Sequence, residues 1–515
     1  MPLGIVSQYG RSNGPAIRFW PANAASTAYL RCLVYNAGLM TPRLRQPPRL
    51  PMLFHCRYLL SVVLFCGSFC NGSMTAHGEA LHPNMVVMIA DDMSFDDCGA
   101  YGHPTIQTPN IDRLANQGMR FDAAMLTCSS CSPSRTSILT GRYPSATGAR
   151  ELHLPVPATQ TLLTTPLRKA GYWTVAAGKW HLGNAVVEQF DSVLQKDNGP
   201  SGCERWVEAL RARPKDQPFF AWLAAFDPHR DYQQGTFDPP HAADSSRVPP
   251  YLPDNVATRA DLAMYYDEIA RFDSFVGKVL DELEQQGIAK HTIVVVMSDN
   301  GRPFPRCKTT VYDSGVRTPF VVSLPGVTAS GAASRSLVSS VDLAPTLLDL
   351  AGLQSDTFQG VSFLPVLKNA EASVREHAYS EHNWHDYQAC ERSVRDQRYR
   401  YIRNWRPELP GTPPADAVRS PTYVEMLKLE QTGELTAAQR NPLVQPRPAE
   451  ELYDLQSDPH ELRNLIDQPA HQATVQRLRA ALTAWQAEID DPGPAGGSED
   501  RFDRTTGKRL PKPLR

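Results

Sequence analysis

Short runs of apolar residues, each followed by polar side chains, constrain the fold of this chain more than any other feature of its sequence. The runs comprise residues 85–90, 173–177, 219–226, 292–297 and 320–324. Several of them are continuous rather than alternating, which is typical of strands that are buried on both faces of a parallel sheet. Because amphipathic segments separate the runs, we predict an α/β fold in which helices cover a mostly parallel sheet.

Helix start and stop signals lie between these runs. Residues 108–118 contain a Thr N-cap, a Pro at the first helical position and a Gly stop, and residues 161–170 also end before a Gly. The longest amphipathic stretch, 259–286, carries one apolar stripe and ends before Gly287. These signals predict helices in all three segments.

The pattern changes near residue 375. Residues 390–394 and 397–404 favour an antiparallel pair of strands, and 475–489 favours a final amphipathic helix. After Asp490 we expect a loose tail. The sequence therefore predicts a large α/β domain followed by a smaller C-terminal α+β subdomain that contains an antiparallel sheet. The predicted divisions are 1–80 for an N-terminal extension, 81–375 for the large domain, 376–490 for the subdomain and 491–515 for the tail.

The N-terminal region resembles an exported leader rather than folded protein. At about 52–76, a basic residue precedes a short apolar core and then small polar residues, the layout of a secretory signal. The apolar core is too short to span a bilayer comfortably. We therefore expect Met52 to be the true start, with a periplasmic or secreted protein that is not integral to the membrane. The alternative is an ordinary buried helix.

Charge and cysteine usage exclude several classes of protein. The chain has 52 basic and 54 acidic side chains, a net charge of −2, so no basic excess favours nucleic acid as a partner. Ten cysteines in 515 residues are too sparse for a disulfide framework. Cys128 and Cys131 form a C-x-x-C pair, but no second pair follows at the spacing of a zinc site.

Polar side chains follow four of the apolar runs. In an open α/β sheet, ligands bind at the carboxyl edge of the strands, so these side chains should share one edge. A single Asp-Asp pair is more often a turn or a helix cap, but four such coincidences favour a site. The residues concerned are Asp91, Asp92, Lys179, His181, Asp227, His229, Asp299 and Asn300.

The oxygen-bearing members of this set predict a metal site. Carboxylate and amide oxygens without sulfur or imidazole suit Ca²⁺ or Mg²⁺ better than zinc or copper. The three carboxylates around a divalent ion would leave a net negative charge that repels an anionic substrate, so cations must complete the pocket. The metal candidates are Asp91, Asp92, Asp299 and Asn300, and the cation candidates are Arg135, Lys179 and Lys308.

The segment from Cys131 to Arg142 adds an anion site or an activated thiolate. Pro133 suits the first helical position and Gly141 suits a helix stop, which would place Cys131 at a helix N-terminus. Free N–H groups and the helix dipole favour a negative charge there. The segment matches C-x-P-S-R-x-x-x-L-T-G-R, and this long motif resembles the signature of the sulfatase family in the alkaline-phosphatase-like superfamily.

The resemblance extends over residues 84–490. Further matching segments are Asp91-Asp92, 108–114, 178–183, 298–301 and 451–464. The resemblance implies an alkaline-phosphatase-like fold and conversion of Cys131 to formylglycine by a maturation enzyme. It also implies one divalent ion, Ca²⁺ by analogy, held by Asp91, Asp92, Cys131, Asp299 and Asn300.

The resemblance also implies roles for the remaining polar residues. Arg135 and Lys179 would neutralise the sulfate and steady the hydrated aldehyde, a geminal diol. His229 and Lys308 would donate a proton to the leaving atom or stabilise its charge. His181 would accept the proton of the second diol hydroxyl, and the loss of that proton expels sulfate. A phosphatase or phosphonate hydrolase, or a non-catalytic glycan-binding protein, are the alternatives on the same fold.

One departure from the general sulfatase pattern bears on the substrate. The segment 299–308 is short and contains Asp-Asn-Gly-x-Pro-Phe-Pro, a pattern that resembles the sulfamidases. That resemblance implies hydrolysis of N-linked sulfate from glucosamine in heparan-type glycans, with His229 as general acid for the nitrogen leaving group. An O-sulfated sugar is the alternative, in which the Pro-Phe-Pro turn only shortens a loop. The residues expected to contact the substrate are Lys308, Glu381, His382 and His385.

Overall fold

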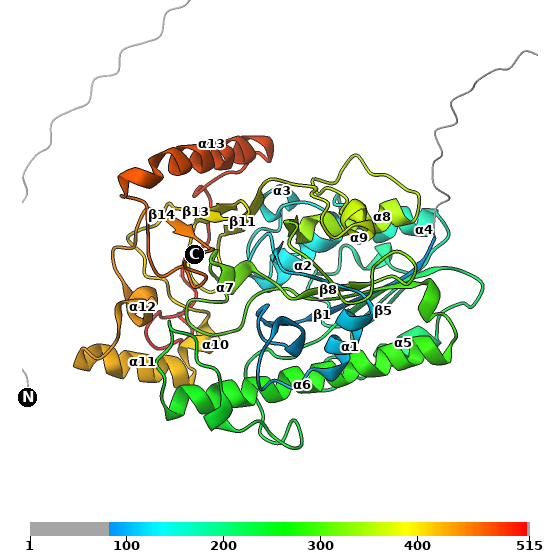
Figure 1. Cartoon of the computed structure of the whole chain (residues 1–515), viewed down its shortest axis with the longest axis horizontal. Coiled ribbons are helices and arrows are strands. Elements are labelled where there is room, and N and C mark those ends of the chain that lie inside the picture. Colours follow the sequence, from blue (N-terminus) through cyan, green and yellow to red (C-terminus); the bar gives the residue numbers. More distant parts are fainter. Residues whose placement is uncertain (1–81, 512–515) are drawn as a thin grey trace, which may run out of the picture. The chain divides into compact units, whose positions relative to one another are not determined.

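A mixed sheet of eight strands forms the centre of the computed structural model, which describes residues 82–511 (Figure 1). The predicted signal segment at 52–76 lies outside the described residues. The strand order is β5-β4-β6-β1-β7-β8-β2-β9, and the five strands from β5 to β7 pair in parallel. β8 is antiparallel to both of its neighbours. The strands are β1 (Asn84–Ala90), β2 (Met119–Phe121), β4 (Trp173–Gly178), β5 (Ser192–Leu194), β6 (Phe219–Ala224), β7 (Thr292–Ser298), β8 (Phe320–Ser323) and β9 (Ala332–Ser334).

Strand β1 shows why its sequence is continuously apolar. Successive side chains of a strand point to opposite faces of the sheet. Met85, Val87 and Ile89 join one hydrophobic cluster, whereas Val86 and Met88 join the cluster on the other side. Both faces of the strand are therefore covered, and the predicted mostly parallel, helix-covered sheet is confirmed.

Helices form a layer on each face of the sheet. One layer contains α2 (Cys131–Thr140), α4 (Thr164–Lys169), α8 (Leu343–Leu350) and α9 (Leu364–Lys368). The other contains α1 (Pro109–Gln117), α5 (Trp206–Arg211), α6 (Val256–Gln285) and α11 (Pro421–Thr432). The long green helix α6 runs along the lower edge of the molecule in Figure 1. No helix within residues 82–511 is both long and apolar enough to cross a membrane.

The start of α2 differs from the sequence-based expectation. Pro133 is the third residue of this helix rather than the first, because Cys131 and Ser132 already have helical geometry. The helix tolerates Pro there, since the amide groups of a first turn have no partner within the helix. The first backbone bond runs from Ser134 N to Ser130 O, at 2.9 Å. Gly141 ends the helix in a left-handed conformation, with a φ of 59°.

A second sheet, of four antiparallel strands, follows in the C-terminal part; the sequence predicted an antiparallel sheet there but identified only the two strands that correspond to β12 and β13. It consists of β11 (Ala378–His382), β12 (Glu391–Arg395), β13 (Tyr399–Asn404) and β14 (Glu450–Asp454). Helix α13 (Gln472–Glu488) packs on it through Val475, Leu478, Leu482 and Trp485. The remaining elements are the paired strands β3 (Ala124–Met125) and β10 (Val338–Ser339), and the short helices α3 (Pro144–Thr147), α7 (Asp313–Val316), α10 (Ala415–Val418) and α12 (Ala437–Arg440).

The segment after residue 490 is packed against the protein, contrary to the expectation of a loose tail. Asp491 forms a buried ion pair with Arg392, at 2.7 Å. Trp384 Nε1 donates to the carbonyl of Glu499 at 2.8 Å, and Phe502 forms a β-bridge with Arg509. The tail is held because its charged and backbone groups find partners on β12 and in the segment that joins β11 to β12.

Candidate active site

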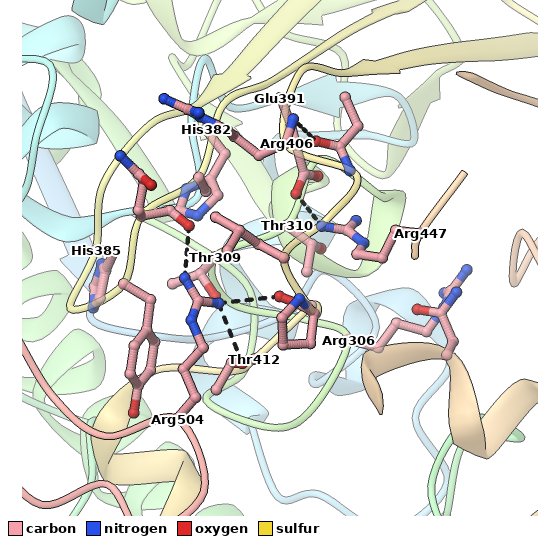
Figure 2. Close-up of a pocket in the computed structure, with 18 of the residues that line it drawn as sticks. Arg306, Thr309, Thr310, His382, His385, Glu391, Arg406, Thr412, Arg447 and Arg504 are labelled. Atoms are coloured by element: carbon pink, nitrogen blue, oxygen red, sulfur yellow. Dashed lines mark hydrogen bonds and ion pairs between the residues drawn. The ribbon is translucent and has the colours of Figure 1, made fainter. Parts of the chain in front are cut away.

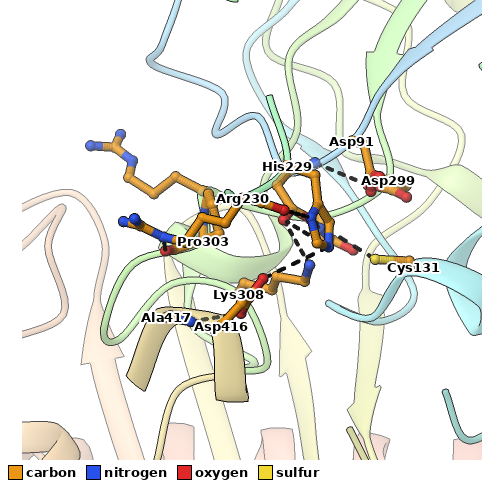
Figure 3. Close-up of polar contacts among 12 residues, drawn as sticks. Asp91, Cys131, His229, Arg230, Asp299, Pro303, Lys308, Asp416 and Ala417 are labelled. Atoms are coloured by element: carbon orange, nitrogen blue, oxygen red, sulfur yellow. Dashed lines mark hydrogen bonds and ion pairs between the residues drawn. The ribbon is translucent and has the colours of Figure 1, made fainter. Parts of the chain in front are cut away.

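The carboxyl ends of β1 and β7 bring the predicted metal residues together. Asp91 and Asp92 follow β1, and Asp299 and Asn300 follow β7. The two strands are parallel neighbours in which Ala90 is paired with Ser298, so the four side chains meet at one edge of the sheet. All four are completely buried. Figure 3 shows Asp91 and Asp299 close together beside Cys131.

Asp92 makes contacts with several of the other candidates. Its carboxylate accepts a hydrogen bond from Lys308 Nζ at 2.7 Å and another from the Asn300 amide. The Cys131 thiol lies 3.9 Å from the same carboxylate. Asp92 has a φ of 81°, a left-handed conformation that is uncommon for a residue with a side chain. Such strain at a cluster of polar groups is typical of functional sites.

Buried cations neutralise the remaining carboxylates. Arg135 Nε donates to Asp299 at 2.8 Å and its guanidinium lies 3.6 Å from Asp91, which also pairs with Lys179. Burial opposes ionisation of Asp91, but Lys179 and other nearby cations outweigh it and hold the pKa of this carboxyl well below its ordinary value. Burial, reinforced by Asp91, raises the pKa of Asp299 to about 7 despite Arg135.

The donor set fits a hard divalent cation. Among the described residues, the buried oxygens Asp91 Oδ1 and Asn300 Oδ1 have no hydrogen-bond partner. Ligand atoms of Asp91, Asp92 and Cys131 lie within 4.8 Å of one another. Buried acceptors without partners are costly unless a donor or a cation satisfies them, and oxygen ligands are those that Ca²⁺ and Mg²⁺ prefer.

Cys131 lies at a cavity of about 550 Å³ that only some of the polar candidates line. Lys308 and the four metal candidates are not among its lining residues. Its thiol is buried at the start of α2, and burial raises the pKa of this unmodified thiol well above its ordinary value. Arg135 does not line the cavity, because it lies behind the carboxylates that it pairs with. The lining includes Lys179, His181, His229 and His385 together with the apolar Leu152, Trp180, Phe226, Ala415 and Phe502.

His153 is a member of this cavity that sequence analysis did not find. Its Nδ1 lies 2.7 Å from Nε2 of His181, a hydrogen-bonding distance. Burial, together with the positive charges of Lys179 and Arg135, lowers the pKa of His181 to about 2, so its imidazole is neutral. His153 follows no predicted strand and belongs to no quoted motif, so nothing local distinguished it.

Asp416 is a second residue that was missed. It is the second residue of α10, in the C-terminal part of the chain, and it lines the same cavity. His229 Nε2 lies 3.8 Å from Asp416 and 3.9 Å from Asp92. Lys308 and His229 hold the pKa of Asp416 below its ordinary value although burial opposes this. Figure 3 shows Asp416, Lys308 and His229 gathered on one side of Cys131.

The structure does not bring all the proposed substrate residues to the cavity. Glu381 is fully buried, where Ser145 and Asn383 donate to its carboxylate. His382 is buried beside a separate small pocket, so neither residue lines the cavity of Cys131. The pairing of β11 with β12 holds both of them inside the protein. His385, three residues beyond the strand, does line the cavity and lies 2.8 Å from Ser130 Oγ.

Comparison with known proteins agrees with this geometry. Residues 83–353, more than half of the chain, match the family model described as sulfatase. The chain belongs to the sulfatase family. This sulfatase also matches, over residues 306–409, the model described as N-sulphoglucosamine sulphohydrolase, C-terminal.

Two curated relatives match this sulfatase over most of its length. An ulvan-active sulfatase of Formosa agariphila is 32% identical over 460 residues, which cover 79% of this chain and 75% of the relative. Human N-sulphoglucosamine sulphohydrolase is 32% identical over 469 residues, which cover 81% of this chain and 93% of the relative. Membership of this family makes the protein a hydrolase.

Solved structures confirm the fold. One was determined in complex with its substrate D-glucosamine-2-N,6-O-disulfate and has a TM-score of 0.62 at 21% identity. The match covers 80% of this sulfatase and 99% of that chain. The phosphonate monoester hydrolase of Agrobacterium radiobacter shares the same fold, with a TM-score of 0.60 at 18% identity.

Proposed function

We propose that this sulfatase acts on sulfated carbohydrates and removes N-linked sulfate from glucosamine in heparan-type glycans. The observation that carries the proposal is the match of residues 306–409 to the C-terminal model of N-sulphoglucosamine sulphohydrolase. That segment contributes Lys308 beside Asp92 and His385 on the cavity wall. The matched residues thus belong to the site itself and not only to the surrounding fold.

The chemistry rests on two groups that the site is built to hold. Asp91, Asp92, Asp299 and Asn300 would hold a divalent cation, which would supply Lewis-acid polarisation of a sulfate oxygen, and Cys131 converted to formylglycine would supply a hydrated aldehyde as nucleophile. Lys179 and Lys308 place positive charge beside these carboxylates, so the site does not repel an anionic substrate. The enclosed position of both lysines strengthens their attraction for sulfate oxygens.

Two histidines move protons in this proposal. His229 is one third exposed and lies between the cluster and Asp416, where it donates a proton to the leaving nitrogen. An amine leaves poorly unless it is protonated, so N-sulfate hydrolysis depends on this donor. His181 lines the cavity beside Cys131, where it accepts the proton whose loss expels sulfate, and His153, 2.7 Å away, orients its ring.

The test is to offer enzyme matured at Cys131 both N-sulfoglucosamine and glucosamine 6-O-sulfate and to measure released sulfate. We expect clear preference for N-sulfoglucosamine. Preference for the 6-O-sulfate, or no release from the sulfamate, would contradict the N-sulfate assignment and leave the sulfatase assignment standing. Mass spectrometry of the peptide that contains Cys131 must first show conversion to formylglycine, which identifies the preparation as competent.

The role of His229 gives a second test of the same proposal. We expect His229→Gln to lower kcat on N-sulfoglucosamine by about a hundredfold. The same variant should change hydrolysis of 4-nitrophenyl sulfate by less than about threefold, since nitrophenolate leaves without a proton. Equal losses on both substrates would show that His229 does not act as the acid.

An O-sulfated glycan is the second candidate substrate. It is favoured by the ulvan-active relative, whose identity to this chain is also 32%. Release of sulfate from oligosaccharides of ulvan, in preference to N-sulfoglucosamine, would support it. Phosphatase and phosphonate hydrolase activities are tested in the same assay by replacing the aryl sulfate with an aryl phosphate.

Maturation and export complete the proposal. Conversion of Cys131 requires a formylglycine-generating enzyme as a partner, and the segment 52–76 would direct the protein to the periplasm or the medium. Fractionation of cells of the native host tests the second point. Full-length protein that stays in the cytosol would contradict export.

A further inference from the structure

The cavity beside Cys131 has an apolar part that sulfate chemistry does not require. Its lining combines the cationic Lys179 with the aromatic Phe226 and Phe502. Phe226 is 38% exposed and is the one aromatic among the exposed large apolar side chains within residues 82–511. A volume of about 550 Å³ also exceeds what a sulfate group needs and is in the range of small-molecule sites.

Phe502 reaches this cavity from the C-terminal tail, far from the catalytic motifs in the sequence. The tail turns back on itself, since Asp503 N donates to the carbonyl of Lys508 and Leu510 N to that of Arg501, both at 2.8 Å. Phe502 lies within this turn and is half-buried against the hydrophobic cluster that contains Val86 and Met88 of β1. The aromatic ring is therefore presented by a folded segment.

Hydrogen bonds attach the turn to the walls of the cavity. Arg501 N donates to the carbonyl of Asp386 at 2.8 Å, and Arg419 donates to that of Gly507 at 3.0 Å. Asp386 and Arg419 themselves line the cavity. The tail is thus bonded to residues that share the cavity with Phe502, and its position is tied to theirs.

Arg504 attaches the tail to segments outside this cavity. Its guanidinium forms an ion pair with Asp500 at 2.6 Å and donates to the carbonyls of Gln388 at 2.9 Å and Pro410 at 3.1 Å. It also lies 5.0 Å from the centre of the Tyr387 ring. Figure 2 shows Arg504 extending from the tail, with dashed lines that join its guanidinium to Thr412 and other neighbours.

We propose that Phe502 and Phe226 bind the apolar face of the substrate's sugar ring, and that the tail 499–510 is a specificity-determining part of the site. A pyranose has an apolar face of C–H groups and a polar edge of hydroxyls. Aromatic rings match the face, whereas Asp386 and Arg419 match the edge with an acceptor and donors. The inference rests on the proposed function only in that the substrate is a sulfated sugar.

Substitution of Phe502 tests the proposal on whichever sulfated glucosamine the wild type hydrolyses best. We expect Phe502→Ala to raise KM by about threefold to tenfold, because the variant loses the binding free energy of one aromatic contact. Its kcat should change by less than about twofold. Phe502→Tyr should restore KM and Phe502→Leu should not, because stacking needs a flat ring. Leu510→Ala is the matched control in the same turn, outside the cavity, and should leave KM unchanged.

A double substitution tests whether the tail acts through Phe502. We expect Arg504→Gln to raise KM as Phe502→Ala does, and the double variant to show no further rise, since both remove one contact. Thermal unfolding of each variant verifies that it is folded at the assay temperature. An unchanged KM in Phe502→Ala, or full rescue by Leu, would overturn the sugar contact, and additive effects would overturn the role of the tail.

These outcomes are separate from the proposed function. The substrate preference of the wild type decides between N-sulfate and O-sulfate. The ratio of variant to wild-type KM on the preferred substrate decides the role of Phe502. If the wild type prefers the 6-O-sulfate, the role of Phe502 can therefore still be tested by the same measurement on that substrate.

Discussion

Two clusters of buried charge in this protein have similar composition and different surroundings. The first contains the carboxylates at the ends of β1 and β7 with Arg135, Lys179 and Lys308. The second, the interface cluster, lies where α7 meets the four-stranded sheet. It consists of Asp313, Arg395, Arg400 and Glu461.

The interface cluster is internally matched. Asp313 accepts from Arg395 at 2.9 Å and from Arg400, and Arg400 lies 2.8 Å from Glu461. Burial opposes ionisation of Asp313, but the two guanidinium groups outweigh it and hold its pKa well below the ordinary value. The residues of this cluster do not line the cavity of Cys131.

The cluster at the sheet edge differs in its surroundings. Its Lys179 lines the cavity of about 550 Å³ beside Cys131, and the buried amide oxygen Asn300 Oδ1 has no hydrogen-bond partner. Burial of charge therefore does not by itself identify an active site. The adjoining cavity distinguishes the candidate active site from the interface cluster.

The largest expected difference between the two clusters concerns turnover. We expect Cys131→Ser to lower steady-state turnover by more than about 10⁴-fold, because a serine has one hydroxyl and leaves a stable sulfate ester. Mass spectrometry should show sulfate on the serine peptide, and the thermal unfolding midpoint should stay near that of the wild type. Rapid multiple turnover by this variant would refute the mechanism.

The interface cluster should instead control stability. We expect Asp313→Ala to reduce the free energy of unfolding by about 3–5 kcal/mol, because it leaves the guanidinium groups of Arg395 and Arg400 buried without their shared partner. Denaturant unfolding measures this loss. Activity per folded molecule should stay close to that of the wild type.

A matched control for this substitution lies in the same sheet. Arg398 pairs with Asp454, but its side chain is 53% exposed, so Arg398→Ala should change the free energy of unfolding by less than about 1 kcal/mol. Equal losses in the free energy of unfolding for Asp313→Ala and Arg398→Ala would show that the interface cluster does not contribute specially to stability.

Cation binding should stabilise the protein through the first cluster only. Ca²⁺ at about a hundredfold its dissociation constant should add about 2.7 kcal/mol to the free energy of unfolding of chelator-treated protein. Asn300→Ala should remove this gain, whereas Arg398→Ala should retain it. The measurement does not depend on activity or maturation, and Mg²⁺ is compared in parallel. A wild type that neither cation stabilises would contradict the metal site.

The smallest expected effect concerns Asp416, which the C-terminal part contributes to the cavity. We expect Asp416→Asn to lower kcat by about fivefold or less, since its 3.8 Å contact with His229 is partly exposed to solvent. The same substitution combined with His229→Gln should cause no further loss. Additive losses would show that Asp416 acts independently of His229.

Much of the fold and the metal site could be predicted from local sequence. The continuous apolar runs identified β1, β4, β6, β7 and β8, because a strand buried on both faces needs apolar side chains at every position. Helix boundaries were less accurate. α6 begins at Val256 rather than 259, because Asn255 caps it by accepting from Thr258 N.

The proposed substrate contacts were predicted less well. Glu381 and His382 lie on a strand whose pairing with β12 holds both of them away from the cavity, and no local pattern announces that pairing. Conversely, the sequence after Asp490 suggested a loose tail because the residues that hold the tail lie elsewhere in the chain and cannot be recognised from its local sequence. Arg392 is one such partner, and it lies on β12.

The sequence by itself determined the strands, the polar residues at their ends and Cys131 at the start of a helix. Parallel strands end at one edge of a sheet, so residues distant in the chain could be assigned to one site from local pattern alone. Only the tertiary structure decided that His153, Asp416 and Phe502 belong to the cavity and that Glu381 does not. These residues come from loops, a short helix and the tail, whose positions depend on packing against other parts of the chain and not on a repeating local pattern.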